Sequence, residues 1–570
     1  MAGCLSENTI QEFIAGLLTR DTLERARGHC NGCSTCGLLV SELFHDCSEL
    51  RPTSDPAASG TLTTCWGHHE HGAAPHDLVE RFEIVRPLGR GGMGVVYEAI
   101  DRTSGARVAL KSLRHESADA LLRFKNEFRA LQGVEHPNLV KLGELTEERG
   151  QWWFTMEVVD GVDFVTHVRP SRTALDENRL RDALGQLVSA LQALHRYGLV
   201  HRDIKPHNVL VTKSGRVVLL DFGLVANVAQ SSSNVVGTPL YMAPEQAMLH
   251  EVGAPADWYS VGVLLYEALA GEAPFSLERS LLRILQAKQH TLPPRPGELA
   301  RIPRDLELLC MDLLAVDPAA RPGADAILAR LQRSVPPAAQ STAPAITPIP
   351  DSYQSELDVL AEAFAKTRTG QNAMVLVRDG SGMGENELVS HFVADLRARD
   401  HAVVVLAGRC YERETVPYKG FDGVVDALTR YLCKLPATDI AALLPRRAGF
   451  LVQVFPVMGK IVPRQQSPLH DVHDPDELRM KAFSALRELL GRLAERNPLV
   501  VCIEDLQWAD ADSLDLLGHL MATSETPDML LVMTSRSTSV IPDGGVVDSN
   551  DQMTRLLALP GLRVVELERS

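Results

Sequence analysis

The sequence lacks any apolar run long enough to cross a membrane. No stretch of ~18 consecutive apolar residues occurs, and the first residues contain no apolar core of the kind found in a secretory signal. It also lacks an excess of positive charge, because 57 Lys and Arg residues stand against 73 Asp and Glu residues, a formal net charge of −16. A nucleic-acid binder or a protein of anionic membrane surfaces would need a basic face. We therefore expect a cytoplasmic protein with no nucleic-acid partner and no membrane anchor.

The sequence also lacks a disulfide framework and a fixed-period repeat. Of its ten cysteines, six precede residue 66 and the other four are scattered. In a reducing compartment such a cluster indicates metal or redox chemistry rather than disulfides. A chain of 570 residues exceeds a single core, and we expect about three to five folding units.

Shifts in composition divide the chain into segments. A Cys- and His-rich unit (1–47) is followed by a Pro-, Ser-, Gly- and His-rich linker (48–75). A long globular segment (76–334) ends at a Pro-, Ala-, Ser- and Thr-rich spacer (335–350). The last segment (351–570) alternates helical patterns with short apolar runs, which predicts buried parallel strands in an α/β domain. These runs are Ala373–Val377, Ala402–Leu406, Leu499–Ile503 and Met529–Met533.

A glycine-rich stretch is the first feature that bears on chemistry. It reads Gly89-Arg-Gly-Gly-Met-Gly94, and alone it fits a dinucleotide site or a plain turn as well as a phosphate-binding loop. The next apolar strand carries Val108-Ala-Leu-Lys111, which places a lysine where it could bind the α- and β-phosphates of ATP. An amphipathic helix follows, and its Glu127 lies on a face that could pair with Lys111. The apolar positions of this helix are Leu121, Phe124, Phe128 and Leu131.

Three further motifs follow in order. They are His201-Arg-Asp203-Ile-Lys205-Pro-His-Asn208, Asp221-Phe-Gly223 and Ala243-Pro-Glu245. The whole series resembles the protein kinases, and among them the bacterial eukaryotic-like (Hanks-type) serine/threonine kinases, from about Phe82 to about Leu331. The resemblance implies a multidomain chain with a bilobal α+β kinase fold that transfers the γ-phosphoryl group of ATP to protein hydroxyls with Mg²⁺.

The resemblance also implies a role for each motif residue. Asp203 would accept or orient the proton of the substrate hydroxyl, and Lys205 would offset charge on the transferred group, as is typical of serine/threonine rather than tyrosine kinases. Asn208 and Asp221 would supply hard oxygen ligands for Mg²⁺. The ATP site would comprise Leu88, Gly89, Gly91, Gly92, Gly94, Val96, Ala109, Lys111, Met156, Glu157 and Val159. In this set, Met156 would lie at the back of the adenine pocket, and Glu157 to Val159 would form the hinge.

Other residues would support or regulate the site. Glu245 and Arg321 resemble the structural ion pair of the family, and Asp257 resembles the aspartate that braces the catalytic loop. Arg202 precedes Asp203, which implies control by phosphorylation of the activation segment, because such an arginine can pair with a phosphate. The nearest candidate phosphosites are Ser231, Ser232 and Ser233, although these serines also fit a polar loop tip. Thr238 fits a role in shaping the substrate-binding loop better than a role as the main phosphosite.

The N-terminal unit carries a pattern typical of metal sites. His29, Cys33 and Cys36 are spaced four and three residues apart, which resembles the zinc-binding anti-sigma-factor domain, with Cys4 as the fourth ligand. A Cys₃His site suits structural Zn²⁺, and a helical module this small needs such a staple. Cys30 is a rival fourth ligand, and a redox switch of Cys33 with Cys36 or ordinary reduced thiols are the alternatives to zinc. The linker histidines His68, His69 and His71 fit incidental polar residues better than ligands.

The C-terminal segment resembles the AAA-type signalling ATPases. The resemblance rests on Ser381-Gly-Met-Gly384 after an apolar run and on Ile503-Glu-Asp-Leu-Gln-Trp-Ala-Asp510. The chain departs from the family where the phosphate loop has its first glycine, lysine and serine, because Asp379, Glu385 and Asn386 stand there. Glu504 likewise stands where an aspartate is usual. We expect an incomplete, degenerate P-loop domain that does not hydrolyse ATP, in a chain that is either a truncated gene product or a fragment.

Two other function classes compete with catalysis. The chain could be a scaffold in which the kinase domain matters mainly for its contacts, although the intact Lys111, Asp203 and Asp221 favour an enzyme. Alternatively, the N-terminal module could make it an anti-sigma-like regulator with a sigma factor as its partner.

Overall fold

The computed structural model describes most of the chain after residue 80. The described residues are 81–90, 94–113, 117–148, 150–171, 174–222, 226–227, 239–247, 252–276, 281–331, 353–379, 384–463, 474–521, 526–536, 557 and 561–567. All of them belong to one compact unit, Val79–Ser570. The predicted zinc ligands Cys4, His29, Cys33 and Cys36 and the linker 48–75 lie outside the described residues. Within that described part of the chain, none of the helices combines the length and apolar character that a bilayer span requires.

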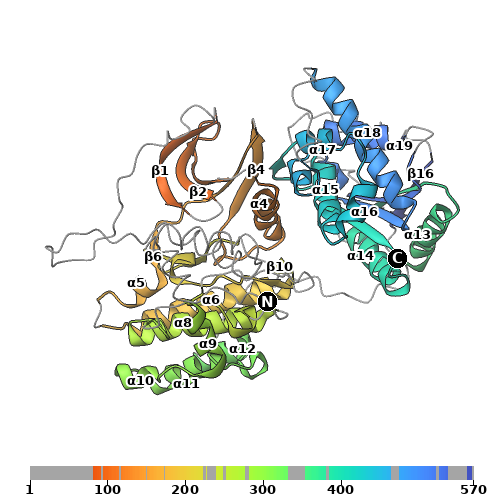
Figure 1. Ribbon diagram of the computed structural model, residues 1–570. Helices are drawn as coiled ribbons and strands as arrows, with labels where there is room; N and C mark the ends of the chain where they lie inside the picture. The colour runs from red at the N-terminus through yellow and green to blue at the C-terminus, as the bar shows by residue number, and fades with distance from the viewer. Residues whose placement is uncertain are drawn as a thin grey trace, which may run out of the picture. The chain divides into compact units, whose positions relative to one another are not determined.

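The first lobe is a twisted sheet with one helix (Figure 1). Its strands are β1 (Phe82–Arg90), β2 (Gly94–Asp101), β3 (Arg107–Leu113), β4 (Leu142–Glu148) and β5 (Gln151–Glu157). They pair antiparallel in the order β1-β2-β3-β5-β4, and a short strand, β13 (Glu414–Thr415), extends this sheet at β4. Helix α4 (Ala118–Ala130) begins after Ser117, whose side chain accepts a hydrogen bond from the amide of Ala120. The amphipathic helix predicted from Leu121, Phe124 and Phe128 is confirmed.

The second lobe is mostly helical (Figure 1). Its main helices are α6 (Glu177–Arg196), α8 (Ala254–Ala270) and α11 (Arg304–Leu313), and helix α8 is buried on nearly all sides, as its apolar sequence requires. A three-stranded sheet of β6 (Gly161–Asp163), β8 (Val209–Thr212) and β9 (Val217–Leu219) supports the loops of the site. The shorter elements are α5 (Phe164–Val168), β7 (Leu199–Val200), η2 (Pro206–Asn208), β10 (Ala226–Asn227), α7 (Pro244–Ala247), α9 (Leu281–His290), α10 (Pro296–Leu299), η3 (Pro318–Ala320) and α12 (Ala324–Arg330).

The C-terminal segment forms a parallel α/β sheet, as predicted. Three of the apolar runs lie within β11 (Ala373–Asp379), β14 (Leu499–Glu504) and β15 (Met529–Arg536). The fourth run, Ala402–Leu406, overlaps β12 (Val404–Arg409), which begins two residues later than predicted. They pair in parallel in the order β12-β14-β15-β11, and β16 (Leu562–Leu567) adds a fifth strand beside β11. Strand β16 was not predicted, because it is an edge strand whose residues are half exposed and form no continuous apolar run. The helices are α13 (Gln354–Thr367), α14 (Glu385–Arg399), α15 (Lys419–Leu432), α16 (Ala437–Leu443), α17 (Gly449–Val454), η5 (Pro456–Lys460), α18 (Pro475–Ala494), η7 (Leu506–Trp508) and α19 (Ala511–Met521).

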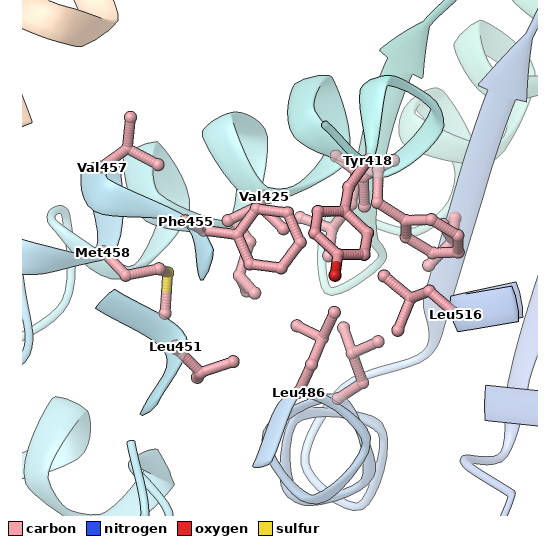
Figure 2. Close-up of a cluster of buried hydrophobic side chains, with 14 of the residues drawn as sticks. Tyr418, Val425, Leu451, Phe455, Val457, Met458, Leu486 and Leu516 are labelled. Carbon is pink, nitrogen blue, oxygen red and sulfur yellow. The ribbon is translucent and has the colours of Figure 1, made fainter. Parts of the chain in front are cut away.

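Aromatic rings organise the core beside this sheet (Figure 2). The Tyr418 ring lies 5.6 Å from the Phe455 ring and 5.7 Å from the Phe483 ring, between centroids. Leu486 of α18 and Leu516 of α19 pack around Tyr418 in the same cluster (Figure 2). This packing joins the residue before α15 to α18 and α19.

Candidate active site

Three charged residues from separate elements meet at the inner edge of the first sheet. The Lys111 Nζ of β3 lies 2.5 Å from Glu127 Oε1 of α4 and 3.0 Å from Asp221 Oδ1. Lys111 and Glu127 are buried, whereas the Asp221 side chain is 45% exposed. The ion pair expected between Lys111 and Glu127 is therefore formed, with Asp221 as a second carboxylate on the same ammonium group.

The neighbouring carboxylates keep the Lys111 side chain in its charged form. Burial alone would lower the pKa of Lys111, but the charges of Glu127 and Asp221 raise it above its usual range. The protein around Asp221 removes part of the water from its half-exposed carboxylate, which would raise the pKa, but the positive charge of Lys111 holds the pKa at about 2. Burial raises the pKa of Glu127 to about 7 although Lys111 opposes this shift. Lys111 thus remains a cation able to meet phosphate oxygens at neutral pH.

The catalytic-loop residues converge beside this cluster. Lys205 Nζ lies 2.9 Å from Asp203 Oδ2, and the Asn208 side-chain amide donates to the Asp203 backbone oxygen (2.8 Å) and Oδ2 (3.0 Å). These contacts fix the Asp203 carboxylate, which is 9% exposed. The His201 ring lies 3.0 Å from the Leu220 carbonyl oxygen and packs edge-on against the Phe222 ring, which ties the loop to the residues around Asp221.

Asp257 braces the catalytic loop from helix α8. Its carboxylate accepts hydrogen bonds from the backbone amides of His201 (2.9 Å) and Arg202 (2.8 Å) and contacts His195 Nε2 at 2.8 Å. Burial would raise the pKa of Asp257, but its contact with His195 lowers it below its usual value. Arg202 adopts a left-handed φ of 67°, a conformation that these bonds hold in place. The bracing role of Asp257 requires these contacts to the loop, and it stays a prediction.

The residues expected around the adenine and phosphates line the first sheet. Gly89 and Gly94 flank the loop, and a Cβ at Gly94 would come 2.0 Å from the Ser112 carbonyl oxygen, so that position requires glycine. Gly91 and Gly92 lie outside the described residues. Ala109 pairs with Met156 across β3 and β5, and Val96 pairs with Lys111. The remaining wall residues are Leu88 on β1, Glu157 at the end of β5 and Val159 just after it.

Arg216 and Lys288 were not identified from the sequence, and both are tied to the site. Arg216 pairs with the hinge residue Glu157 at 2.8 and 3.0 Å. The buried Lys288 of α9 donates to the carbonyl oxygens of Pro239 (2.9 Å), Leu240 (2.6 Å) and Met242 (2.8 Å), just after Thr238. Burial lowers the pKa of Lys288 to about 7. No sequence pattern marks either residue, because their partners lie 46 to 59 positions away.

The expected structural ion pair lies beneath the same loop. Arg321 donates to Glu245 at 2.6 and 2.9 Å, both side chains are buried, and Arg321 also donates to the carbonyl oxygens of Ala315 and Pro255. A bidentate, buried and fully satisfied pair of this kind fixes local geometry. The candidate phosphosites Ser231, Ser232, Ser233 and Thr238 lie outside the described residues.

The residues at the site suit Mg²⁺ binding. Asp221 uses Oδ1 for Lys111 and has an exposed carboxylate, and Asn208 points its amide nitrogen toward Asp203, which leaves its carbonyl oxygen on the opposite side of the group. Mg²⁺ typically takes one or two protein oxygens together with phosphates and water. Within the described ranges no group of three or more His, Cys, Asp or Glu side chains suited to a metal is found.

The second phosphate-loop region has a different character. Glu385 at the start of α14 is buried, with no hydrogen-bond partner for either carboxylate oxygen among the described residues, and burial raises its pKa. Asn386 Oδ1 accepts a hydrogen bond of 2.6 Å from Thr534, and Asp379 accepts one from the Gly384 amide. A buried acid therefore occupies the place where a phosphate-binding loop presents a cation.

Comparisons with known proteins divide the chain into a kinase domain and an AAA-type domain. The protein kinase domain family matches residues 82–331, and the AAA ATPase domain family matches residues 354–533. The probable serine/threonine-protein kinase PknB of Lactococcus lactis is 32% identical over 248 residues, 42% of this chain and 39% of that protein. The serine/threonine-protein kinase pkn2 of Myxococcus xanthus is 37% identical over 268 residues, 44% of this chain and 32% of that protein.

Coverage differs among the relatives. The chain spans only about a third of the length of the first two, but it covers 71% of the serine/threonine-protein kinase PknA of Mycobacterium tuberculosis, with 34% identity over 309 residues. The kinase motifs, their geometry and this coverage lead to one assignment. The chain belongs to the bacterial serine/threonine-protein kinases.

Proposed function

We propose that this chain transfers the γ-phosphoryl group of ATP to serine and threonine hydroxyls of proteins, itself included, in the bacterial cytoplasm. The observation that carries this proposal is the assembled cluster of Lys111, Glu127 and Asp221 beside Asp203. Phosphoryl transfer passes through a loose transition state, so catalysis consists mainly of positioning and charge neutralisation. Every residue needed for these tasks is present.

The proposed roles follow from the contacts. Lys111, held by Glu127, binds the α- and β-phosphates, while the glycine loop brings backbone amides close to them. Asp203 receives or orients the proton of the substrate hydroxyl, and Lys205 at 2.9 Å offsets charge on the transferred group. Asp221 and Asn208 hold Mg²⁺, which bridges the phosphates and neutralises their charge.

We also propose that phosphorylation of the activation segment raises activity. Arg202 is buried, and its Nε has no hydrogen-bond partner among the described residues. A buried guanidinium without a full set of acceptors is a suitable partner for a phosphate. A phosphate on Ser231, Ser232 or Ser233 would supply the acceptor oxygens.

We make separate proposals for the N-terminal module and for the AAA-type domain, which lie on either side of the kinase domain in the sequence. His29, Cys33, Cys36 and Cys4, with Cys30 as a rival for Cys4, would bind Zn²⁺ in an anti-sigma-like module that could engage a sigma factor or another regulator. The AAA-type domain would be non-hydrolysing, because Glu385 opposes phosphate binding and Asn386 is engaged by Thr534.

The test is phosphorylation of the purified full chain with labelled ATP and Mg²⁺. Wild-type protein should label itself on serine or threonine, and Lys111→Ala should reduce the rate by about 100-fold or more, since it removes a phosphate-binding charge. The surface variant Lys213→Ala serves as the matched control, because Lys213 is exposed and should leave the rate unchanged. Absence of label in the wild type with a basic protein substrate present would contradict the proposal and favour a scaffold.

A further inference from the structure

Helix α4 carries two buried cations that face the C-terminal domain. Lys125 Nζ lies 2.8 Å from Asp422 and 2.7 Å from Asp426, both on α15. Arg129 contacts Glu414 of β13 at 2.7 Å, Asp422 at 2.6 Å and Asp426 at 2.9 Å. The Lys125, Asp426 and Glu414 side chains are 1%, 2% and 0% exposed. We refer to these five side chains as the α4–α15 charge cluster.

The α4–α15 charge cluster is too well buried to be an incidental surface contact. Exposed ion pairs contribute little, whereas removing one partner of a buried pair leaves an uncompensated charge and is strongly destabilising. Here three carboxylates and two cations satisfy one another, and the charge of Glu414 keeps the pKa of Arg129 above its usual range although burial opposes this. Such a cluster specifies one docked arrangement, because any shifted arrangement of the two surfaces would leave at least one of these charges buried without its partner.

Backbone pairing adds a second, independent contact. Strand β13 pairs in parallel with β4, so that Glu414 lies opposite Leu145 and Thr415 opposite Thr146. The Leu145 amide donates to the Arg413 carbonyl oxygen at 3.0 Å, and the two threonine hydroxyls lie 2.7 Å apart. The edge of the kinase sheet is thereby covered by the C-terminal domain, which satisfies backbone groups that an open edge would expose.

Apolar packing and one peripheral ion pair complete the contact. Helix α4 packs against η5, and Phe124 and Phe128 belong to the same hydrophobic cluster as Val457 and Met458. Lys460 of η5 pairs with Asp119 in the first turn of α4, with 35% and 56% of the two side chains exposed. The contact thus extends along α4 from Asp119 to Arg129.

The same helix positions the active site. Glu127 lies between Lys125 and Arg129 in the sequence, but about 200° around the helix from Lys125, so it faces Lys111 while the two cations face α15. A helix held from one side by the C-terminal domain cannot easily carry Glu127 away from Lys111. Where an element has two positions, a contact made in only one of them shifts the population toward that one.

We infer that the C-terminal domain is an internal activator, which docks on α4 through Asp422, Asp426 and Glu414 and holds Glu127 against Lys111. This inference rests on the proposed kinase function, because the effect it predicts is on the rate of autophosphorylation. The inference also assigns to the AAA-type domain a role that does not require nucleotide binding. The occupant of this face of the kinase lobe is therefore a segment of the same chain, residues 411–460.

The docked state can be tested by zero-length cross-linking of the full chain. A carbodiimide activates the Asp119 carboxylate, and the Lys460 amine then forms an amide bond as the carbodiimide leaves as a urea. Mass spectrometry should find the Asp119–Lys460 linked peptide in the wild type and not in Asp119→Asn. Absence of this peptide from the wild type would overturn the docking.

The effect on α4 is tested with the double variant Asp422→Lys/Asp426→Lys. It should reduce the linked peptide, speed hydrogen exchange of the α4 amides and slow autophosphorylation about tenfold, a coupling of ordinary size. Asp512→Lys is the matched control, because Asp512 pairs with Arg479 inside the same domain, and it should leave all three unchanged. Loss of the linked peptide with an unchanged or faster rate would overturn the inference.

The experiments distinguish a failure of the proposed kinase function from a failure of the docking proposal. If the wild type does not phosphorylate at all, the proposed function fails, while cross-linking and α4 hydrogen exchange still decide the docking. If the double variant does not fold, the milder Asp426→Asn replaces it, with the same three measurements and the same expected directions.

Discussion

Lys288 illustrates how one side chain can shape a binding loop from a distance. Its buried side-chain nitrogen donates to the backbone carbonyl oxygens of Pro239, Leu240 and Met242. The loop follows Thr238, which the family resemblance assigns to substrate binding. We therefore predict that Lys288 positions this loop for the protein substrate rather than for ATP.

Lys288→Met should raise the KM for a basic protein substrate about tenfold and leave the KM for ATP within about twofold. The methionine fills a similar volume but removes the donor from the buried Met242 carbonyl oxygen and from the part-buried oxygens of Pro239 and Leu240. A buried group left unsatisfied carries a penalty of about 1–3 kcal/mol. Steady-state kinetics with each substrate varied in turn would measure the two values. A shift in both KM values would indicate a general structural role instead. Lys213→Met, at an exposed position, is the control.

Packing between helices dominates at the scale of elements. Helices α8 and α11 approach closely at Gly262, where a Cβ would lie 2.8 Å from Leu313 Cβ and 3.2 Å from its carbonyl carbon. Gly491 in α18 has nothing within 4 Å of the same position. The two glycines thus differ in environment although both lie in helices.

Gly262→Ala should lower the melting temperature of the kinase domain, because overpacking a rigid core costs about 1–3 kcal/mol. Gly491→Ala should leave the melting temperature unchanged or raise it, since alanine is about 1 kcal/mol better than glycine in a helix interior. Calorimetry of the full chain would separate the two variants. Equal shifts of the melting temperature in the same direction for the two variants would show that the close contact of Gly262 with Leu313 does not exclude a larger side chain.

At the scale of the whole molecule, the chain joins a kinase domain to an AAA-type domain that we propose to be degenerate, because Glu385 is buried at the start of α14. Wild-type protein should bind one ATP per chain in calorimetry. Asp379→Gly/Glu385→Lys/Asn386→Ser restores the residue types of a phosphate-binding loop and should raise this number toward two. Two equivalent sites in the wild type would contradict the assignment of the second fold as degenerate.

The sequence was sufficient to predict those parts of the structure that local sequence patterns encode. The ordered motifs around Lys111, Asp203 and Asp221 predicted the kinase fold, and four apolar runs predicted four of the five strands of the C-terminal sheet. Strand β16 was missed because only Val565 and Leu567 are buried in it. A half-exposed edge strand leaves too weak a periodic signal.

The contacts between helix α4 and the C-terminal domain could not be predicted from the sequence. Lys125 and Asp422 lie 297 positions apart, and Arg129 and Glu414 lie 285 apart. Each helix shows only two like charges four residues apart, which is also the pattern of a solvated surface. Tertiary pairing of this kind becomes visible only when the fold brings the two surfaces together.

The most direct test of the account separates ATP binding from transfer in Asp203→Asn. We propose that Asp203 lies at the substrate hydroxyl, whereas Lys111 and the Mg²⁺ held by Asp221 bind the phosphates. The full-length variant should therefore bind ATP with Mg²⁺ within about threefold of the wild type, while autophosphorylation falls by about 100-fold or more, in line with loss of a general base. Retained transfer in Asp203→Asn, or loss of ATP binding together with transfer, would contradict the account.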